Sequence, residues 1–241
     1  MDDGLDWRIE RACAAAFPPV RCETVDTWAV AVSGGPRRRI NSASPLGPDA
    51  TLDTATVARI AAIYAGQVAR VRVPDLVAVD AALDAAGFAP PDGRTRTLGR
   101  PLDRAPVPDA GVILTTAPDA AWLATRSTLS LAIDGMAEDY AAPLARLAIP
   151  AAFARIDDRA VAYAAVADGV LVLEAVATHP DARRQGRARH CVASLLHWGA
   201  GAGATYAALQ VAADNARAIA LYRGLGFLCD HYGYHYRERV G

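Results

Sequence analysis

Three apolar segments separated by short turns, followed directly by an amphipathic helix, constrain the fold of this chain more than any other feature. The segments are Ala151–Ile156, Ala160–Ala167 and Val170–Thr178. Asp168-Gly169, between the last two, is typical of a two-residue hairpin turn, because both of its residues adopt positive φ easily. The apolar positions that follow repeat with the period of one helix face: Ala188, Cys191, Val192, Leu195 and Leu196. This pattern predicts an antiparallel meander that leads into a helix.

The elements around this core complete a mixed α/β domain. An apolar strand is expected at 111–115, helix at 118–147, and another strand at 206–211. A second helix opens near Asp214-Asn215, which are good N-cap residues, and stops at Gly226; a closing strand follows at 227–237. The order is therefore β-α-β-β-β-α-β-α-β, with a mixed, mostly antiparallel sheet.

The N-terminal half reads as a smaller version of the same plan. Patterns and turn residues predict helices at 5–16, 54–65 and 75–86, a hairpin of 28–32 with 37–42, and strands at 68–73 and 95–98. A proline-rich stretch at 101–111 predicts a linker, hence domains 1–107 and 108–241. Gly87-Phe88 and Gly226-Phe227 end similar helices, which suggests an internal duplication offset by about 140 residues.

Bulk composition narrows the functional classes. Hydrophobic residues make up 53%, charged residues 21%, and the net charge is -1, so no global field attracts nucleic acid or anionic lipid. All 25 basic residues are arginine. No apolar run reaches the ~20 residues that span a bilayer, and the 4 cysteines show no metal-binding spacing. We expect a cytoplasmic protein without a metal, a membrane or a nucleic-acid partner.

The chemically informative stretch is residues 173–198. After a strand and a proline turn, Arg183-Arg184-Gln185-Gly186-Arg187-Ala188 opens a helix. The first amides of a helix lack internal partners and suit phosphate oxygens, and arginines add charged donors. The segment favours binding of a diphosphate, although a solvated, arginine-rich helix start has the same composition. A nucleic-acid patch is less favoured, since no aromatic residues interleave with the arginines.

The spacing Arg-x-x-Gly-x-Ala after Val176-Ala177-Thr178, and Asn215 followed by Tyr222, resemble motifs A and B of the GNAT superfamily of N-acetyltransferases. The resemblance covers roughly residues 110–240. It implies a GNAT-like fold, acetyl-CoA as cosubstrate, and a pantetheine arm in a gap beside the motif A strand. Val176, Ala177 and Thr178 would bond that arm by their main chain, and Asn215 by its side chain. The diphosphate would be held by Arg183, Arg184, Gln185, Gly186, Arg187, Ala188 and Arg189.

The resemblance also suggests the catalytic groups. Tyr222 would protonate the departing CoA thiolate, although its place on an apolar helix face also fits a core aromatic. Glu174 would accept the proton of the amine, directly or through water; a solvated strand residue is the alternative. Strand alternation puts Glu174 on the face of Val176 and Thr178. His179, His231 and His235 are weaker bases. No cysteine occupies a motif position, so a covalent acyl-enzyme is not expected.

The N-terminal half lacks these motifs. Leu76 and Leu83 align with Asn215 and Tyr222, so we expect a degenerate GNAT-like domain that binds no CoA. Arg37-Arg38-Arg39 and Asn41 are read as an exposed hairpin strand, with a reach into the acceptor groove as the alternative.

The leading function is acetyl-CoA-dependent N-acetylation of an amine in a ternary complex. The alternatives are a non-catalytic acyl-CoA-binding or interaction module on the same fold, and O-acylation. The acceptor is expected near 134–140, where Asp134, Glu138 and Asp139 could attract a cation, although exposed acidic helix residues are commoner than ligands. A homodimer is compatible with these features.

Overall fold

A computed structural model describes residues 3–104, 106–134 and 140–240. The chain forms two compact units, which we treat separately. Unit 1 contains Met1–Pro18, Leu98–Val211 and Ala216–Asp230, and unit 2 contains Pro19–Thr97, Ala212–Asn215 and His231–Gly241. The predicted division at residue 107 therefore follows the linker but not the compact units. Residues 1–18 of the N-terminal half belong to unit 1, and residues 231–241 of the C-terminal half belong to unit 2.

Unit 1 is built on the predicted meander. β6 (Ile113–Thr115), β7 (Ala151–Ile156), β8 (Ala160–Ala167) and β9 (Val170–Thr178) pair antiparallel in sequence, and β10 (Tyr206–Ala212) pairs parallel with β9. β9 and β10 can run parallel because α6 (Arg187–Gly201), which connects them, crosses back over the sheet. The β-α-β-β-β-α-β-α-β order and the mixed sheet are confirmed.

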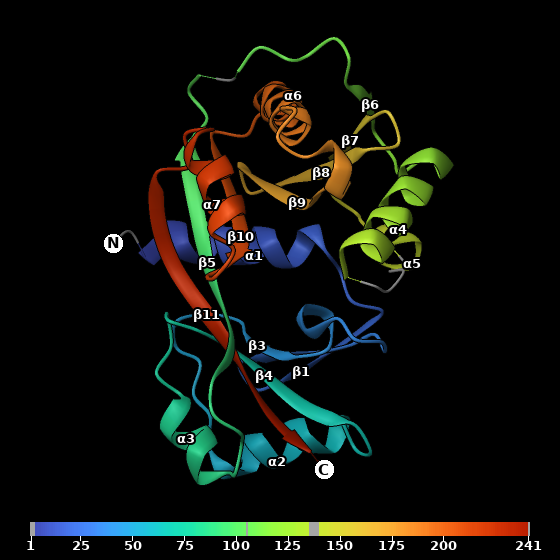
Figure 1. Ribbon diagram of the computed structural model, residues 1–241. Helices are drawn as coiled ribbons and strands as arrows, with labels where there is room; N and C mark the ends of the chain where they lie inside the picture. The colour runs from blue at the N-terminus through green and yellow to red at the C-terminus, as the bar shows by residue number, and fades with distance from the viewer. Residues whose placement is uncertain (1–2, 105, 135–139, 241) are drawn as a thin grey trace. The chain divides into compact units, whose positions relative to one another are not determined.

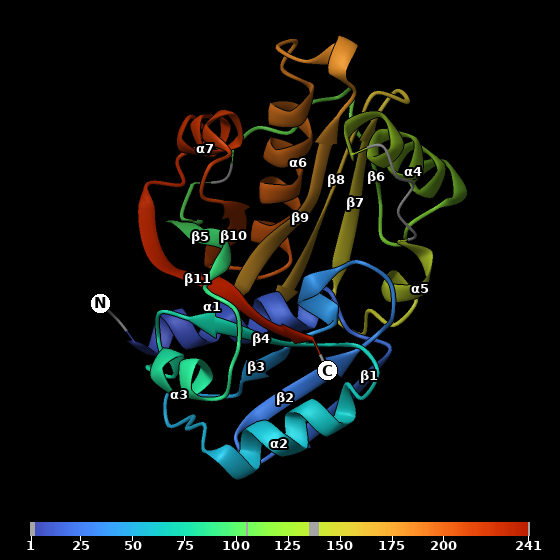
Figure 2. The ribbon, with the colours of Figure 1, turned by 60° about the horizontal axis from the view of Figure 1, so that its bottom comes forward.

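Helices cover both faces of this sheet, as Figures 1 and 2 show for α6 on one side and α1 (Asp3–Ala16) and α4 (Ala120–Asp134) on the other. Alternate residues of β7, β8 and β9 pack with Cys191, Val192, Leu195 and Leu196 of α6 in one buried cluster. A Cβ atom on Gly199 would lie 1.9 Å from Leu171, so the helix can approach this closely only with glycine there. On the opposite face the Tyr163 hydroxyl donates to the Ala16 carbonyl.

Three short elements complete unit 1: α5 (Ala141–Leu144), the 3-10 helix η2 (Pro180–Ala182) and α7 (Ala216–Arg223). The helix predicted at 118–147 is α4 followed by α5, and residues 135–139 between them lie outside the described part of the chain. Gly226, with φ 88°, follows α7 in a left-handed turn, as expected of a glycine that terminates a helix.

Unit 2 repeats the plan on a smaller scale. β1 (Arg21–Val25), β2 (Trp28–Val32) and β3 (Ala43–Pro45) pair antiparallel, and β4 (Val68–Pro74) pairs parallel with β3 across α2 (Thr54–Ile63). α3 (Asp80–Ala85) then leads to β5 (Asp92–Pro101). β11 (Cys229–Val240) ends the chain, and its residues 234–240 pair antiparallel with β4. β5 and β11 each begin in one unit and end in the other.

The hairpin prediction in this half was wrong in its second strand. β2 pairs with β1 through a turn at Asp26-Thr27, with Asp26 at φ 50°. Residues Arg38–Ile40 form a 3-10 helix, η1, instead of a strand. The cause is Asn41, which is buried and whose side chain accepts from the Ser33 and Gly34 amides and donates to the Arg37 carbonyl. These bonds make a compact loop.

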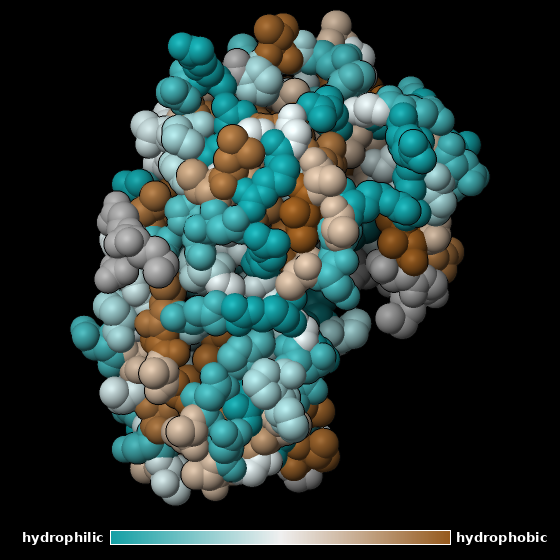
Figure 3. Space-filling view, turned by 60° about the vertical axis from the view of Figure 1, so that its left-hand side comes forward, coloured by the Kyte–Doolittle hydropathy of each residue, from teal (hydrophilic) through white to brown (hydrophobic). Residues whose placement is uncertain are grey.

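On the face shown in Figure 3, hydrophobic residues form several separate groups among hydrophilic residues, and none of these groups dominates the surface. No helix within the described residues combines the length and hydropathy that a bilayer crossing requires.

Candidate functional site

The carboxyl end of β9 separates from its neighbour β10. Their parallel pairing runs from Val170 with Tyr206 to Leu173 with Leu209. Both strands continue past the last pair, β9 to Thr178 and β10 to Ala212. Main-chain groups of residues 174–178 on the β10 side therefore lie outside this ladder. The diverging strands leave an edge to which an extended ligand can bond.

A β-bulge lies at the start of that edge. Glu174 pairs with Tyr163 and Ala177 with Val161, so one residue of β8 faces two of β9, and Ala175 has φ 53°. The extra residue reverses the alternation of side chains. Glu174 therefore shares a sheet face with Ala177 and not with Thr178, and the strict alternation expected from the sequence was wrong here. The sequence of residues 174–177, Glu-Ala-Val-Ala, contains no residue that indicates a bulge.

The loop after β9 presents main-chain amides at the start of α6. Arg184 and Gly186 have φ 62° and 76°, and Gly186 is the N-cap of α6 without any side-chain capping bond. Left-handed residues alternating with ordinary ones turn successive N–H groups to one side. Those groups and the helix dipole favour an anion here. His179, considered as a base, instead caps η2, since its ring accepts from the Asp181 amide.

The arginines of this loop fall into two groups. Arg189 donates to the Gly224 carbonyl after α7 at 2.9 Å, and Arg187 contacts Asp157 at 3.5 Å and the Gln185 side chain. These two stabilise the protein around the loop. For half-buried Arg183 and exposed Arg184, the described part of the chain provides no ion-pair partner. Their guanidinium groups are the ones that remain available to a phosphate.

Two buried polar atoms at the site have no hydrogen-bond partner among the described residues. They are the Thr178 hydroxyl at the end of β9 and Nε of Arg187 in the first turn of α6. Burying such atoms unbonded costs free energy, so a bound polar ligand would relieve that cost. Together with the uncapped amides, they fit a diphosphate and a pantetheine arm. No group of side chains suited to a metal ion occurs within the described residues.

Tyr222 is a buried titratable group of unit 1. Its side chain is 8% exposed, and its ring packs edge-on against Phe227 with 6.0 Å between centroids. Burial, and secondarily the negative charge of Glu174, raise the pKa of the Tyr222 phenol above its ordinary value. The charge of Glu174 thus reaches Tyr222, and the phenol is protonated at neutral pH.

Cysteine chemistry has little support in unit 1. Cys191 lies inside the α6 cluster with no exposed surface. Burial and the charge of Asp109 raise the pKa of the Cys191 thiol to about 12. A thiol of that kind is almost wholly protonated at neutral pH and is a poor nucleophile.

Asn215 belongs to unit 2 and is exposed. Its amide donates to the Ala212 carbonyl at 3.0 Å, which closes the turn between β10 and α7. The side chain therefore stands directly before the first residue of α7. Of the segment expected to hold the acceptor, Glu138 and Asp139 lie outside the described residues, and the Tyr140 hydroxyl accepts a hydrogen bond from the Arg126 guanidinium at 2.9 Å.

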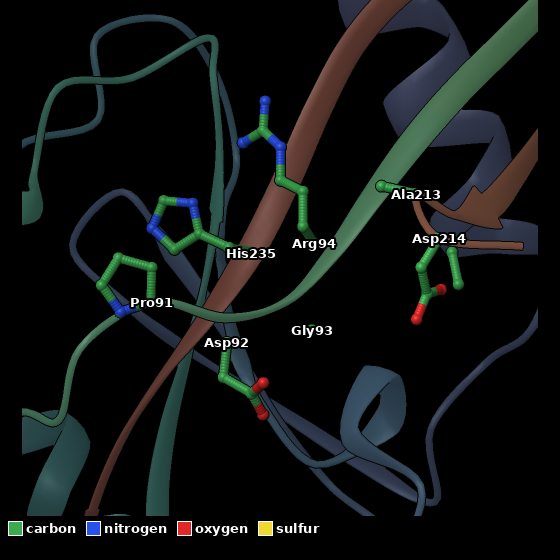
Figure 4. Close-up of a pocket in the computed structure, with 8 residues that line it drawn as sticks. Pro91, Asp92, Gly93, Arg94, Ala213, Asp214 and His235 are labelled. Carbon is green, nitrogen blue, oxygen red and sulfur yellow. The ribbon is translucent and has the colours of Figure 1, made fainter.

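Unit 2 contains a pocket of about 600 Å³. Figure 4 shows its lining, with His235, Asp92 and Asp214 separated around it. Three of its ionic groups have partners within unit 2: Asp92 with Arg38 at 2.7 Å, Arg94 with Asp75 at 2.5 Å, and His235 with Asp80 at 3.0 Å. His235, considered as a base, is therefore part of a structural hydrogen-bonded network, and the pocket has no strong excess of one charge.

Three features stand together in unit 1: a mixed sheet with a bulged and diverging strand, a helix after it that starts without a side-chain cap, and a buried, protonated tyrosine. They are the features of an acyltransferase of the GNAT fold. Residues 7–237 match the family described as "Probable histone acetyltransferase Rv0428c C-terminal". The chain belongs to this family, and it is an N-acetyltransferase of the GNAT superfamily. The resemblance seen in the motifs is confirmed.

Individual relatives agree with this assignment. The chain is 32% identical over 230 residues to the probable histone acetyltransferase Rv0428c of Mycobacterium tuberculosis, covering 93% of this chain and 71% of that protein. A GCN5-related N-acetyltransferase from Kribbella flavida has a TM-score of 0.70 at 20% identity, over 100% of this chain and 96% of that one. A tandem GNAT protein from the clavulanic acid biosynthesis pathway has a TM-score of 0.60 at 15% identity, over 93% and 85%. The two structures share the fold.

Proposed function

We propose that this protein transfers an acetyl group from acetyl-CoA directly to an amine within a ternary complex. The observation that carries the proposal is the uncapped start of α6, with Gly186 in a left-handed conformation beside the open edge of β9. Among the ligands that GNAT enzymes use, a diphosphate suits those amides and an extended pantetheine arm suits that edge.

The binding roles follow from the site. Main-chain groups of Val176, Ala177 and Thr178 bond the pantetheine arm, and the Thr178 hydroxyl gains the partner it lacks. Arg183 and Arg184 neutralise the diphosphate and Nε of Arg187 gains a partner in it, while Gln185 and Ala188 shape the loop that holds it. Arg189 acts indirectly, by fixing the end of α7 against α6. Asn215 bonds the arm from the turn before α7.

The reaction needs proton transfers from the amine nitrogen and to the departing thiolate. Glu174 accepts a proton from the alkylammonium, directly or through water, and the neutral nitrogen attacks the thioester carbonyl. Main-chain amides of the open β9 edge stabilise the negative oxygen that develops. The carbon–sulfur bond then breaks and the thiolate takes the proton of Tyr222, while the nitrogen gives its remaining extra proton to the Tyr222 phenolate, directly or through water.

The test is Tyr222→Phe, assayed by release of CoA thiol from acetyl-CoA with a panel of primary amines. We expect kcat to fall by roughly 10²–10⁴-fold, because a general acid is removed, with little change in the Kd for acetyl-CoA. Tyr64→Phe is the matched control, since Tyr64 is also buried but donates to the Ala31 carbonyl in unit 2. Equal turnover of Tyr222→Phe and wild type would remove Tyr222 from the mechanism.

The panel should include a lysine-rich, histone-like peptide, because the Mycobacterium tuberculosis relative is named a probable histone acetyltransferase. All 25 basic residues of this chain are arginine, so any acetyl-lysine found by mass spectrometry comes from the added peptide. A hydroxyl acceptor would instead give an ester that hydroxylamine cleaves. CoA binding without turnover of any acceptor would favour a non-catalytic acyl-CoA-binding module.

A further inference from the structure

His190 lies over the glycine that opens α6. Its main-chain amide donates to the Gly186 carbonyl at 3.0 Å, which closes the first turn of the helix. A Cβ atom on Gly186 would lie 3.2 Å from Nε2 of His190, and Nε2 is the ring atom nearest to that position. The imidazole therefore lies against Gly186, the residue that opens the helix.

The other nitrogen of the ring is held by Asp109. Nδ1 of His190 lies 3.1 Å from Oδ2 of Asp109, in the segment between β5 and β6. Asp109 is itself fixed, because its amide donates to the Ser194 hydroxyl at 3.2 Å and its Oδ1 accepts from the Gly111 amide at 2.8 Å. A carboxylate in that position selects the tautomer with hydrogen on Nδ1 and fixes the direction of the ring.

This arrangement has a consequence for an anion in the loop. In the neutral ring Nε2 carries a lone pair, which repels a phosphate oxygen. In the imidazolium form both nitrogens donate, Nδ1 to Asp109 and Nε2 to the ligand. The nearby charges are Asp109 on one side of the ring and, along the loop and first turn of α6, Arg183, Arg184 and Arg187, the last paired with Asp157.

We propose that His190, positioned by Asp109, is a further ligand of the CoA diphosphate and binds it as imidazolium, so that cofactor binding takes up a proton. The inference rests on the proposed function, because it requires CoA at this loop. The inference adds the His190 imidazole to the diphosphate ligands that the arginines of the motif indicate.

Isothermal titration calorimetry with CoA tests this, at pH values from ~6 to ~8 where histidine titrates. Two phosphate-free buffers of different ionisation enthalpy report the protons taken up. For His190→Gln we expect a Kd roughly tenfold higher at pH ~6, as for loss of one charge-assisted bond, and a smaller change at pH ~8. The proton uptake of wild type should fall in the variant. Because the phosphates of CoA titrate equally with both proteins, only the difference between them is interpreted.

Two further variants complete the test. His197→Gln changes an exposed histidine two turns along α6 and should match wild type in Kd and in proton uptake. Asp109→Asn should lower proton uptake while His190 is intact, because the amide supports the imidazolium less. His190 is 43% exposed in its side chain, so folding of His190→Gln is expected and is checked by its melting temperature. Identical Kd and proton uptake for wild type and His190→Gln would overturn the inference, whereas failure of every variant to bind CoA would overturn the proposed function.

Discussion

α6 in unit 1 and α2 in unit 2 occupy equivalent places, each joining two parallel neighbouring strands, but their N-termini are opposites. At α2, the Asp53 carboxylate caps the helix by accepting from the Thr56 amide at 2.7 Å. At α6, Gly186 has no side chain to do so. Bonds from Thr56 lower the pKa of Asp53, so the cap is anionic at neutral pH. One helix start is capped by a negative charge of the protein itself, and the other is where we propose that the negative charge of a ligand binds.

The C-terminal ends of the next helices show the same contrast. After α3, the Phe88 amide donates to the Leu83 carbonyl at 3.0 Å with Gly87 at φ 75°; after α7, the Phe227 amide donates to the Tyr222 carbonyl at 3.1 Å. The backbone turn is the same, but fully buried Leu83 takes the place of Tyr222. The two units thus share main-chain architecture and differ in the side chains that would do chemistry. We therefore propose that unit 2 binds no CoA.

The largest effect is expected from giving α6 the cap of α2. Gly186→Asp places a carboxylate at the proposed diphosphate site, adds a Cβ 3.2 Å from His190, and strains a residue at φ 76°. We expect the Kd for CoA to rise by at least about 100-fold, from charge repulsion and loss of amide donors. Gly203→Asp is the control, since Gly203 also has positive φ, 87°, but a Cβ there would meet open space. Similar losses in both variants would show that strain, and not the anion site, was responsible.

Removing the N-cap of α2 tests the same comparison in unit 2. Asp53→Ala removes the cap of α2, and the melting temperature should fall by roughly 2–4 °C. CoA should still bind with a stoichiometry of one, because unit 2 also lacks a counterpart of Tyr222 and of the loop arginines. Calorimetry showing a second CoA per chain would mean that α2 is a latent site and that unit 2 is not degenerate in the way we propose.

The smallest effect concerns one buried tyrosine in each unit. Burial raises the pKa of both Tyr64 and Tyr222 above the ordinary ~10. Above pH ~10 the unfolded chain loses these protons while the folded chain keeps them, so the stability they contribute is complete below pH ~10 and is lost as pH rises further. Urea unfolding between pH ~9 and ~11 should show a steeper loss for wild type than for Tyr64→Phe or Tyr222→Phe. If stability fell equally with pH in all three proteins, the pKa values of Tyr64 and Tyr222 would not be raised by folding.

Much of unit 1 could be predicted from the sequence because its signals are local. Strand limits at Ala151–Ile156, Ala160–Ala167 and Val170–Thr178 follow from turn residues and apolar runs, and the α6 face follows from its period. The loop 183–188 was recognised by its resemblance to motif A, taken together with motif B downstream. In unit 2, the strand expected at 37–42 failed because the bonds of Asn41 depend on neighbours that periodicity does not describe.

By itself, the sequence determined the element order of the C-terminal half, the family and the position of the loop with the uncapped helix start, since each depends on residues close together in the chain. Only the tertiary structure decided the bulge at Ala175, the use of Arg189 on Gly224 rather than on a ligand, and the pairing of β11 with β4. These depend on strand register and on contacts between distant segments, which are chosen by the packing of the whole chain. The same holds for Asp109 and His190, which are 81 residues apart and meet only in the folded protein.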